Sequence, residues 1–221
     1  MTKQIKILVA FAVLGLSAVM MASCGGGSGS AGKKLASNDI LGDLPNLIYQ
    51  YNTQDDALRT QAKEEQKNLP FTENGLKKAK AIDEKYSAKR KTLKEKFVAD
   101  IEKLKSSLIG KNIPYEVEDG APFEITSCKI VKLFENGGLH YEIELKITDA
   151  KVIKTNWSNE YWIYCDYIDK DGNKFDGSGC GVIMSKQEKV DGATFTHQEP
   201  MSFSSPENYV NFAKIRFFAK K

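Results

Sequence analysis

The sequence predicts an α+β protein in which a helical hairpin or coiled coil precedes an antiparallel β-sandwich. Apolar residues recur at spacings of three and four up to about residue 112, and they alternate with polar residues after it. The charge balance changes at the same place: residues 32–112 carry 17 basic and 12 acidic residues, whereas residues 113–221 carry 13 and 17. We therefore expect a helical region over 37–112 and a sandwich over 113–221.

Residues 1–23 have the pattern of a secretory signal peptide, which is removed from the mature protein. Lys3 and Lys6 precede an unbroken apolar run over 7–21, and the small residues Ala22 and Ser23 follow it. The alternative is a transmembrane anchor. That alternative is disfavoured because the run is shorter than the roughly 20 apolar residues of a spanning helix, and no basic cluster directly follows it.

The segment Met21-Ala22-Ser23-Cys24 resembles the lipobox of bacterial lipoproteins, with Met in place of the usual Leu. The resemblance implies cleavage before Cys24, lipid on its thiol and acylation of its amine, with palmitate as an expected fatty acid. Two or three acyl chains anchor a protein durably, whereas one binds only marginally. Residues 24–36, which include the glycine-rich stretch 25–32, then read as a flexible linker. The implied location is the cell envelope, at the outer rather than the inner membrane if the cell has both.

Three helical segments are expected between the linker and residue 112. A short amphipathic helix over 37–52 is interrupted by Pro45, and a polar helix begins at Asp55 and Asp56, whose acids suit a first turn. The longest helix, about 76–109, follows Thr72 and stops at Gly110. Each helix has one modest apolar stripe, which favours a hairpin or coiled coil and allows self-association through the long helix.

Strands are expected from residue 113 onward, with no helix between them. Residues 139–147 alternate clearly between apolar and polar, and the turn 135–138 joins them to the Ile- and Val-rich segment 123–134. Further strands are expected over 161–168, 174–184, 193–203 and 208–218. The pattern resembles the immunoglobulin-like modules of many bacterial lipoproteins, so we expect a sandwich of that type.

Three cysteines remain in the expected mature chain besides Cys24: Cys128, Cys165 and Cys180. Cys165 and Cys180 flank the turn 169–173 on adjacent strands, so a disulfide between them is one interpretation. Simple strand registers place Cys165 opposite residue 177 or 178 and leave Cys180 as a diagonal neighbour. The equal alternative is that all three are small buried apolar residues.

The sequence shows no pattern typical of a catalytic, metal or cofactor site. His140 and His197 are the only histidines and lie in no catalytic motif, and no paired Cys-x-x-Cys or His-x-x-x-His spacing exists for zinc. The segment 169–176 resembles the start of a calcium loop, but a hairpin turn explains its Asp, Gly and Asn residues better. The expected mature chain has 30 basic and 29 acidic residues, a balance that gives no indication of nucleic-acid binding.

An aromatic cluster is the only residue-level indication of a binding surface. It consists of Trp157, Tyr161, Trp162, Tyr164 and Tyr167. On a strand, Trp162 and Tyr164 share one face while Tyr161 and Tyr167 share the other, so one aromatic set is either exposed or covered by the helices. We expect a membrane-anchored, non-enzymatic lipoprotein that binds a protein partner or has a structural role. The alternative is a glycan-binding lipoprotein that uses this cluster, and an enzyme with a dispersed site ranks last.

Overall fold

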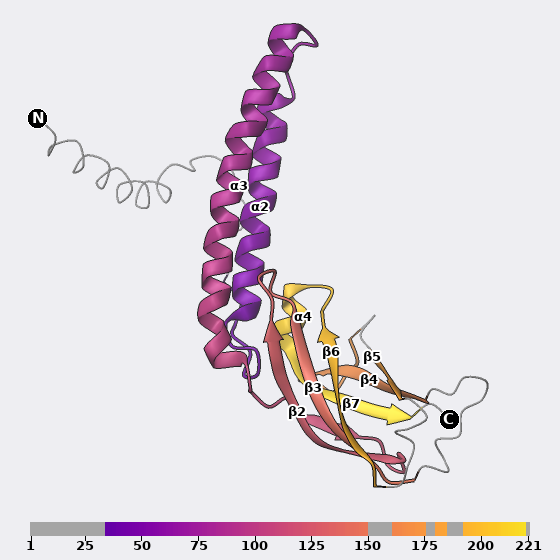
Figure 1. The fold of residues 1–221 in the computed structure, drawn as a ribbon. Coiled ribbons are helices and arrows are strands. Elements are labelled where there is room, and N and C mark those ends of the chain that lie inside the picture. Colours follow the sequence, from indigo (N-terminus) through magenta and orange to yellow (C-terminus); the bar gives the residue numbers. More distant parts are fainter. Residues whose placement is uncertain (1–33, 150–160, 176–179, 185–191, 220–221) are drawn as a thin grey trace, which may run out of the picture. The chain divides into compact units, whose positions relative to one another are not determined.

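The structure is a computed structural model, and it describes residues 34–149, 161–175, 180–184 and 192–219 (Figure 1). All described residues belong to one compact unit, Lys34–Lys221. The expected signal peptide and Cys24 therefore lie outside the described residues. The last residues of the expected linker belong to the folded unit, because Leu35 is buried.

Two long helices, α2 (Leu44–Gln66) and α3 (Glu73–Leu108), form an antiparallel hairpin (Figure 1). The short helix expected over 37–52 and the polar helix expected from Asp55 are in fact one helix. Pro45 occupies its first turn, where the missing N–H costs no hydrogen bond, so this proline begins the helix instead of interrupting it. The N-cap of α3 is Thr72, whose hydroxyl accepts a hydrogen bond from the backbone N–H of Gly75 (3.2 Å).

Asp55 lies in the middle of α2 and is buried against α3, so the prediction that it starts a helix is wrong. Arg90 of α3 donates from Nε to one carboxylate oxygen (2.5 Å), and Arg59 donates from Nε to the other (2.7 Å). These contacts, led by the hydrogen bond from Arg90, lower the pKa of Asp55 below its ordinary value. The carboxylate therefore joins the two helices instead of capping one.

Seven strands follow the hairpin in the described part of the chain and form two small sheets. The strands are β1 (Tyr115–Val117), β2 (Phe123–Leu133), β3 (Leu139–Ile147), β4 (Tyr161–Asp169), β5 (Cys180–Met184), β6 (Thr194–Met201) and β7 (Phe212–Ala219). One sheet has the order β2-β3-β6 and is antiparallel; the other has the order β1-β7-β4-β5 and is antiparallel except for the parallel pair β1 and β7. The structure is thus mixed α+β, as the sequence predicts.

One predicted strand near the C-terminal end needs correction, and one short strand at the start of the β region was not predicted. The strand expected over 208–218 begins only at Phe212, because a short helix, α4 (Pro206–Asn211), precedes it with Ser205 as its N-cap. The sequence analysis also missed β1, which has three residues and pairs only with β7. The turn at 169–173 is confirmed: the Asp169 carboxylate accepts hydrogen bonds from the backbone N–H groups of Asp171 (2.9 Å) and Asn173 (2.8 Å).

The base of the hairpin and the two sheets share one hydrophobic core. Its helical side includes Leu44, Phe97, Ile101 and Leu108, and the sheet side includes the fully buried Tyr141. Asn38 also joins the two parts, because its amide donates to the backbone oxygens of Val210 (2.9 Å) and Phe212 (2.7 Å). Within the described residues, none of the helices is both long enough and apolar enough to span a bilayer.

Candidate binding groove between the helical hairpin and the β2–β3 turn

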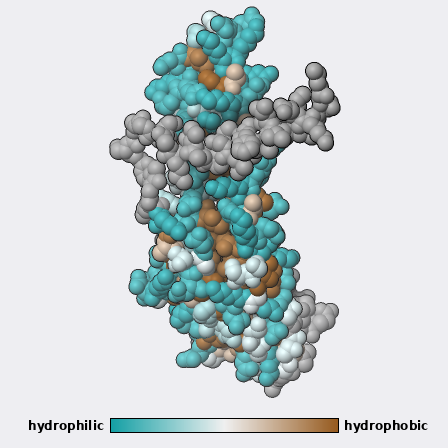
Figure 2. All heavy atoms as spheres, turned by 90° about the vertical axis from the view of Figure 1, so that its left-hand side faces the viewer, coloured by the Kyte–Doolittle hydropathy of each residue, from teal (hydrophilic) through white to brown (hydrophobic). Residues whose placement is uncertain are grey.

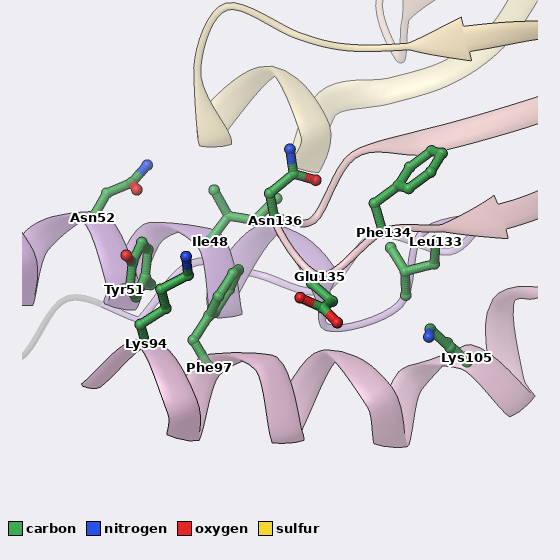
Figure 3. Close-up of a pocket in the computed structure, with 10 residues that line it drawn as sticks. All are labelled: Ile48, Tyr51, Asn52, Lys94, Phe97, Lys105, Leu133, Phe134, Glu135 and Asn136. Atoms are coloured by element: carbon green, nitrogen blue, oxygen red, sulfur yellow. The ribbon is translucent and has the colours of Figure 1, made fainter. Parts of the chain in front are cut away.

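A groove lies where the hairpin meets the turn between β2 and β3, and its volume is about 670 Å³. That volume is in the range of sites that hold small molecules or short peptide segments. Ten residues line it: Ile48, Tyr51 and Asn52 from α2, Lys94, Phe97 and Lys105 from α3, and Leu133, Phe134, Glu135 and Asn136 from the strand end and turn (Figure 3). Three elements that are distant in the sequence therefore build one site.

Helical spacing explains which side chains reach the groove. Ile48, Tyr51 and Asn52 are three and four residues apart on α2, and Lys94 and Phe97 are three apart on α3, so each set shares one helix face. These positions continue the apolar stripes that bury the base of the hairpin. The groove is thus the place where the stripe leaves the core and becomes partly accessible.

The turn is held against the helices at Gly137. Its backbone φ of +83° is favoured by glycine, and a Cβ atom there would lie 3.1 Å from Ile48 Cδ1 and 3.6 Å from Phe97 Cζ. Backbone hydrogen bonds close the turn, from Phe134 N–H to Gly138 O (2.8 Å) and from Gly137 N–H to Phe134 O (2.9 Å). The wall of the groove formed by the turn is therefore fixed in place.

Aromatic rings form the apolar part of the groove. Tyr51 and Phe97 stack with ring centroids 4.5 Å apart and an interplanar angle of 22°. Phe134 keeps 42% of its surface exposed at the other end, with its ring edge-on to His140. Figure 3 shows Tyr51, Lys94 and Phe97 together at one end of the groove and Lys105 at the opposite end, near Leu133 and Phe134.

The charged groups of the groove are two lysines and one glutamate. Lys105 forms an ion pair with Glu102 of its own helix (2.5 Å), so its charge is already balanced. Lys94 is exposed and makes no ion pair with any other described residue. Glu135 is exposed on the turn and lies between the two lysines in Figure 3. The groove thus offers a stacked aromatic floor beside one lysine that is in no ion pair with a described residue.

The aromatic cluster predicted from the sequence is divided between the two faces of its sheet. Tyr167 is 2% exposed and belongs to the core, so of the two faces that the sequence left open, the face of Tyr167 is covered at this residue. Tyr164, on the opposite face, is half-buried and stacks on Phe218 with centroids 5.7 Å apart. Trp157 and the side chains of Tyr161 and Trp162 lie outside the described atoms.

The cysteines have different environments. Cys165 is disulfide-bonded, and Cys180 is its Cα partner in the β4–β5 register, not the diagonal neighbour that simple registers predict. The side chain of Cys180 lies outside the described atoms, so the Cys165–Cys180 bond stays a prediction. Cys128 is free and buried, and burial raises its pKa to about 12, which keeps the thiol protonated and unreactive at neutral pH.

Neither histidine faces a nucleophile among the described residues. His140 contacts the ring of Phe134, and His197 Nε2 lies 2.6 Å from Glu199 Oε1 on β6. In the ranges that the structure describes, no group of three or more His, Cys, Asp or Glu side chains could hold a metal ion.

Nothing in the local sequence pattern indicates that the ten groove residues form one site. The available signal was the Glu135–Gly138 turn between two well-defined strands, which was interpreted only as a connection. No known protein family, curated protein or solved structure matches this chain.

Proposed function

We propose that this protein is a lipid-anchored, non-enzymatic lipoprotein of the bacterial cell envelope that binds a partner through the groove. The lipobox-like residues before Cys24 and the glycine-rich linker support the anchor. The groove supports the binding role. The groove is the main support for this proposal. Its aromatic rings are already stacked and its turn is already packed against the helices without a ligand, which lowers the entropy cost of binding.

The chemistry of the groove favours a protein segment that places an apolar side chain beside a carboxylate. The apolar group would cover the stacked rings of Tyr51 and Phe97. The carboxylate would pair with Lys94, which makes no ion pair with another described residue. Asn52 and Asn136 add exposed amides that can bond to a peptide backbone.

An aromatic anion is a suitable first probe, and we would titrate 8-anilinonaphthalene-1-sulfonate against the full chain. Lys94→Glu should weaken binding by about tenfold, or about 1.4 kcal/mol, because a favourable charge becomes a repulsive one. Lys96→Glu is the matched control, since it makes the same charge change on another face of α3 at an exposed position. Equal affinities for the two variants would remove the groove as the binding site.

The natural partner can be sought in cells by placing a photo-crosslinking residue at Asn136. The turn residue is exposed, so the substitution leaves the core intact. We expect a discrete cross-linked product that disappears when Lys94→Glu is added, and no such product when the crosslinker replaces Lys96. A product that survives Lys94→Glu would indicate contact without use of the groove.

The anchor has its own test. Cys24→Ala should abolish labelling with an alkyne fatty acid and should release the protein from membranes after export. Unchanged labelling would show that Cys24 carries no lipid. Sucrose-gradient separation of the labelled wild-type protein would then distinguish the outer membrane, which we favour, from the inner membrane.

Glycan binding is the second candidate function, and the stacked pair Tyr164 and Phe218 favours it. The two rings lie side by side on neighbouring strands, an arrangement that can stack on a sugar. Tyr164→Ala should then abolish retention on a glycan array, whereas Lys94→Glu should not. The reverse result would assign recognition to the groove.

The immunoglobulin-like sandwich and the coiled coil expected from the sequence also belong to this proposal. Seven described strands in sheets of three and four support an immunoglobulin-like sandwich. Opposed apolar stripes and ion pairs between α2 and α3 support a short antiparallel coiled coil. This proposal assigns no catalytic role to Cys128, because a buried thiol with a pKa of about 12 is a poor nucleophile at neutral pH.

A further inference from the structure

The turn between α2 and α3 exposes large apolar side chains. Phe71 keeps 97% of its surface accessible and Leu76 keeps 57%, the two largest exposed fractions among the large apolar residues described. We call residues 69–78 the hairpin tip. Figure 2 shows hydrophobic side chains gathered at this end of the hairpin, with hydrophilic surface around them. These two side chains are not packed against the core of the described structure, so they are available to contact a partner.

The hairpin tip is a well-ordered turn. Thr72 donates its backbone N–H to Pro70 O (2.8 Å), and Leu76 donates its backbone N–H to Thr72 O (2.9 Å). Gly75 is buried beneath the turn, and a Cβ atom there would lie 1.8 Å from Pro70 O, so only glycine fits. The backbone therefore holds Phe71 outward at little entropic cost on binding.

The arm that carries the tip is braced from one helix to the other. Near the tip, Glu65 of α2 accepts hydrogen bonds from Lys85 Nζ (2.9 Å) and Tyr86 Oη (2.5 Å) of α3. Nearer the base, Asp55 and Arg90 join the same helices. The α2 helix has 23 residues and is thus about 34 Å long.

Positive charge surrounds the apolar residues. Residues 63–80 contain five lysines (Lys63, Lys67, Lys77, Lys78 and Lys80) and three glutamates. Lys67, Lys77 and Lys80 pair with Glu64, Glu73 and Glu84, while Lys78 is exposed and makes no ion pair with another described residue. An aromatic ring and a leucine among excess lysines match a bilayer surface with anionic headgroups, where rings enter the acyl boundary and lysines stay at phosphate level.

We propose that the hairpin tip inserts Phe71 and Leu76 into a lipid bilayer that contains anionic lipids. A projecting ring needs no preformed pocket in a bilayer, which makes lipid a better match than a second copy of this chain. Insertion of the tip does not depend on the proposed lipid anchor.

The test uses Phe71→Trp in the full chain as the cell processes it, reconstituted with vesicles of equal phosphatidylglycerol and phosphatidylcholine. Emission of the introduced tryptophan is obtained by subtracting the spectrum of the unsubstituted chain, which contains Trp157 and Trp162. We expect a blue shift and strong quenching when the acyl chains carry bromine. The matched control is Ser87→Trp, because Ser87 is equally on the surface but lies farther along α3, and it should show neither change. Adding Lys78→Glu to Phe71→Trp should weaken quenching.

Vesicle flotation separates the tip from the anchor. A Phe71→Trp chain that floats with vesicles while its introduced tryptophan stays unquenched would overturn the proposal and leave the anchor in place. A chain that does not float stably but shows quenching of that tryptophan would support the tip and refute the anchor. A blue shift without vesicles that grows with protein concentration would identify a second copy as the occupant and would also overturn the proposal.

Discussion

Replacing Asp55 with Asn tests the interpretation that one buried carboxylate joins the two helices. Asp55 is 7% exposed and accepts hydrogen bonds from Arg90 (2.5 and 3.3 Å) and Arg59 (2.7 Å). The substitution preserves shape but removes the charge, so both guanidinium groups lose their partner. Asp56→Asn is the matched control, because the neighbouring residue is exposed and makes no ion pair with any other described residue.

The expected loss in the free energy of unfolding is about 2 kcal/mol. Breaking a fully buried ion pair costs about 3–5 kcal/mol, because it leaves a charge without water. Here the side chains of Arg90 and Arg59 are 37% and 55% exposed, so water can replace part of what they lose. Hydrogen bonds to charged groups contribute about 1.5–3 kcal/mol, and our value lies within that range.

The direction of the Asp55 pKa shift also predicts how the stability difference between wild type and Asp55→Asn changes with pH. The folded-state pKa of Asp55 is lowered, chiefly by the hydrogen bond from Arg90, so its stabilisation is present above the unfolded-state pKa of about 4. That stabilisation is lost as the pH falls through the lower folded-state value. The difference between wild type and Asp55→Asn should therefore be complete at neutral pH and should shrink in acid.

Urea unfolding followed by circular dichroism at 222 nm measures both effects. A loss below about 0.5 kcal/mol at neutral pH, or a loss equal to that of Asp56→Asn, would refute the role assigned to Asp55. A difference that stays constant from neutral pH into acid would show that the effect comes from packing and not from charge.

Three further predictions follow from single positions. Gly137→Ala should destabilise more than Gly172→Ala, because both positions have positive φ but only a Cβ at Gly137 meets neighbouring side chains; equal losses in thermal melts would contradict a docked turn. Cys128 should react with a disulfide reagent near pH 8 about a thousandfold more slowly in the folded than in the unfolded protein, because burial raises its pKa to about 12. The contribution of this thiol to the free energy of unfolding is complete below about pH 9 and is lost as the pH rises further, because the thiol then ionises more readily in the unfolded chain. Tyr167→Ala should cost about 3–5 kcal/mol in urea unfolding, as expected for a buried aromatic, whereas Tyr164→Ala should cost clearly less, and similar losses would place both rings in the core.

Element types could be predicted where the pattern was long and local. The alternation over 139–147 predicts β3 at its observed bounds, and Thr72 correctly predicts the start of a long helix. Pro45 shows the limit of this reasoning. A proline interrupts a helix only in its interior, and the sequence could not show that α2 begins at Leu44, directly before it. The residues before α2 are held by long-range contacts, such as those of Asn38 with Val210 and Phe212.

The position of Asp55 was predicted wrongly, and the burial of Tyr167 was left open, because both depend on residues distant in the sequence. An acid followed by helix-forming residues looks like a helix start, and its long-range partner Arg90 is 35 residues away in the sequence. Strand periodicity correctly puts Tyr164 and Tyr167 on opposite faces, but it could not say which face is covered. The second sheet and the packing around Phe203 and Phe212 decide that Tyr167 is inside.

The sequence by itself determined that helices come before the strands, the turn at 135–138 and the absence of any recognisable catalytic motif, because these depend on residue type and short-range spacing. Only the tertiary structure decided that the hairpin base and both sheets share one core, that a groove forms between the hairpin and the β2–β3 turn, and that Phe71 is exposed to solvent. The physical reason is that burial and charge balance depend on neighbours distant in the sequence. Lys94 and Glu135 approach the same groove only because the β2–β3 turn packs against both helices.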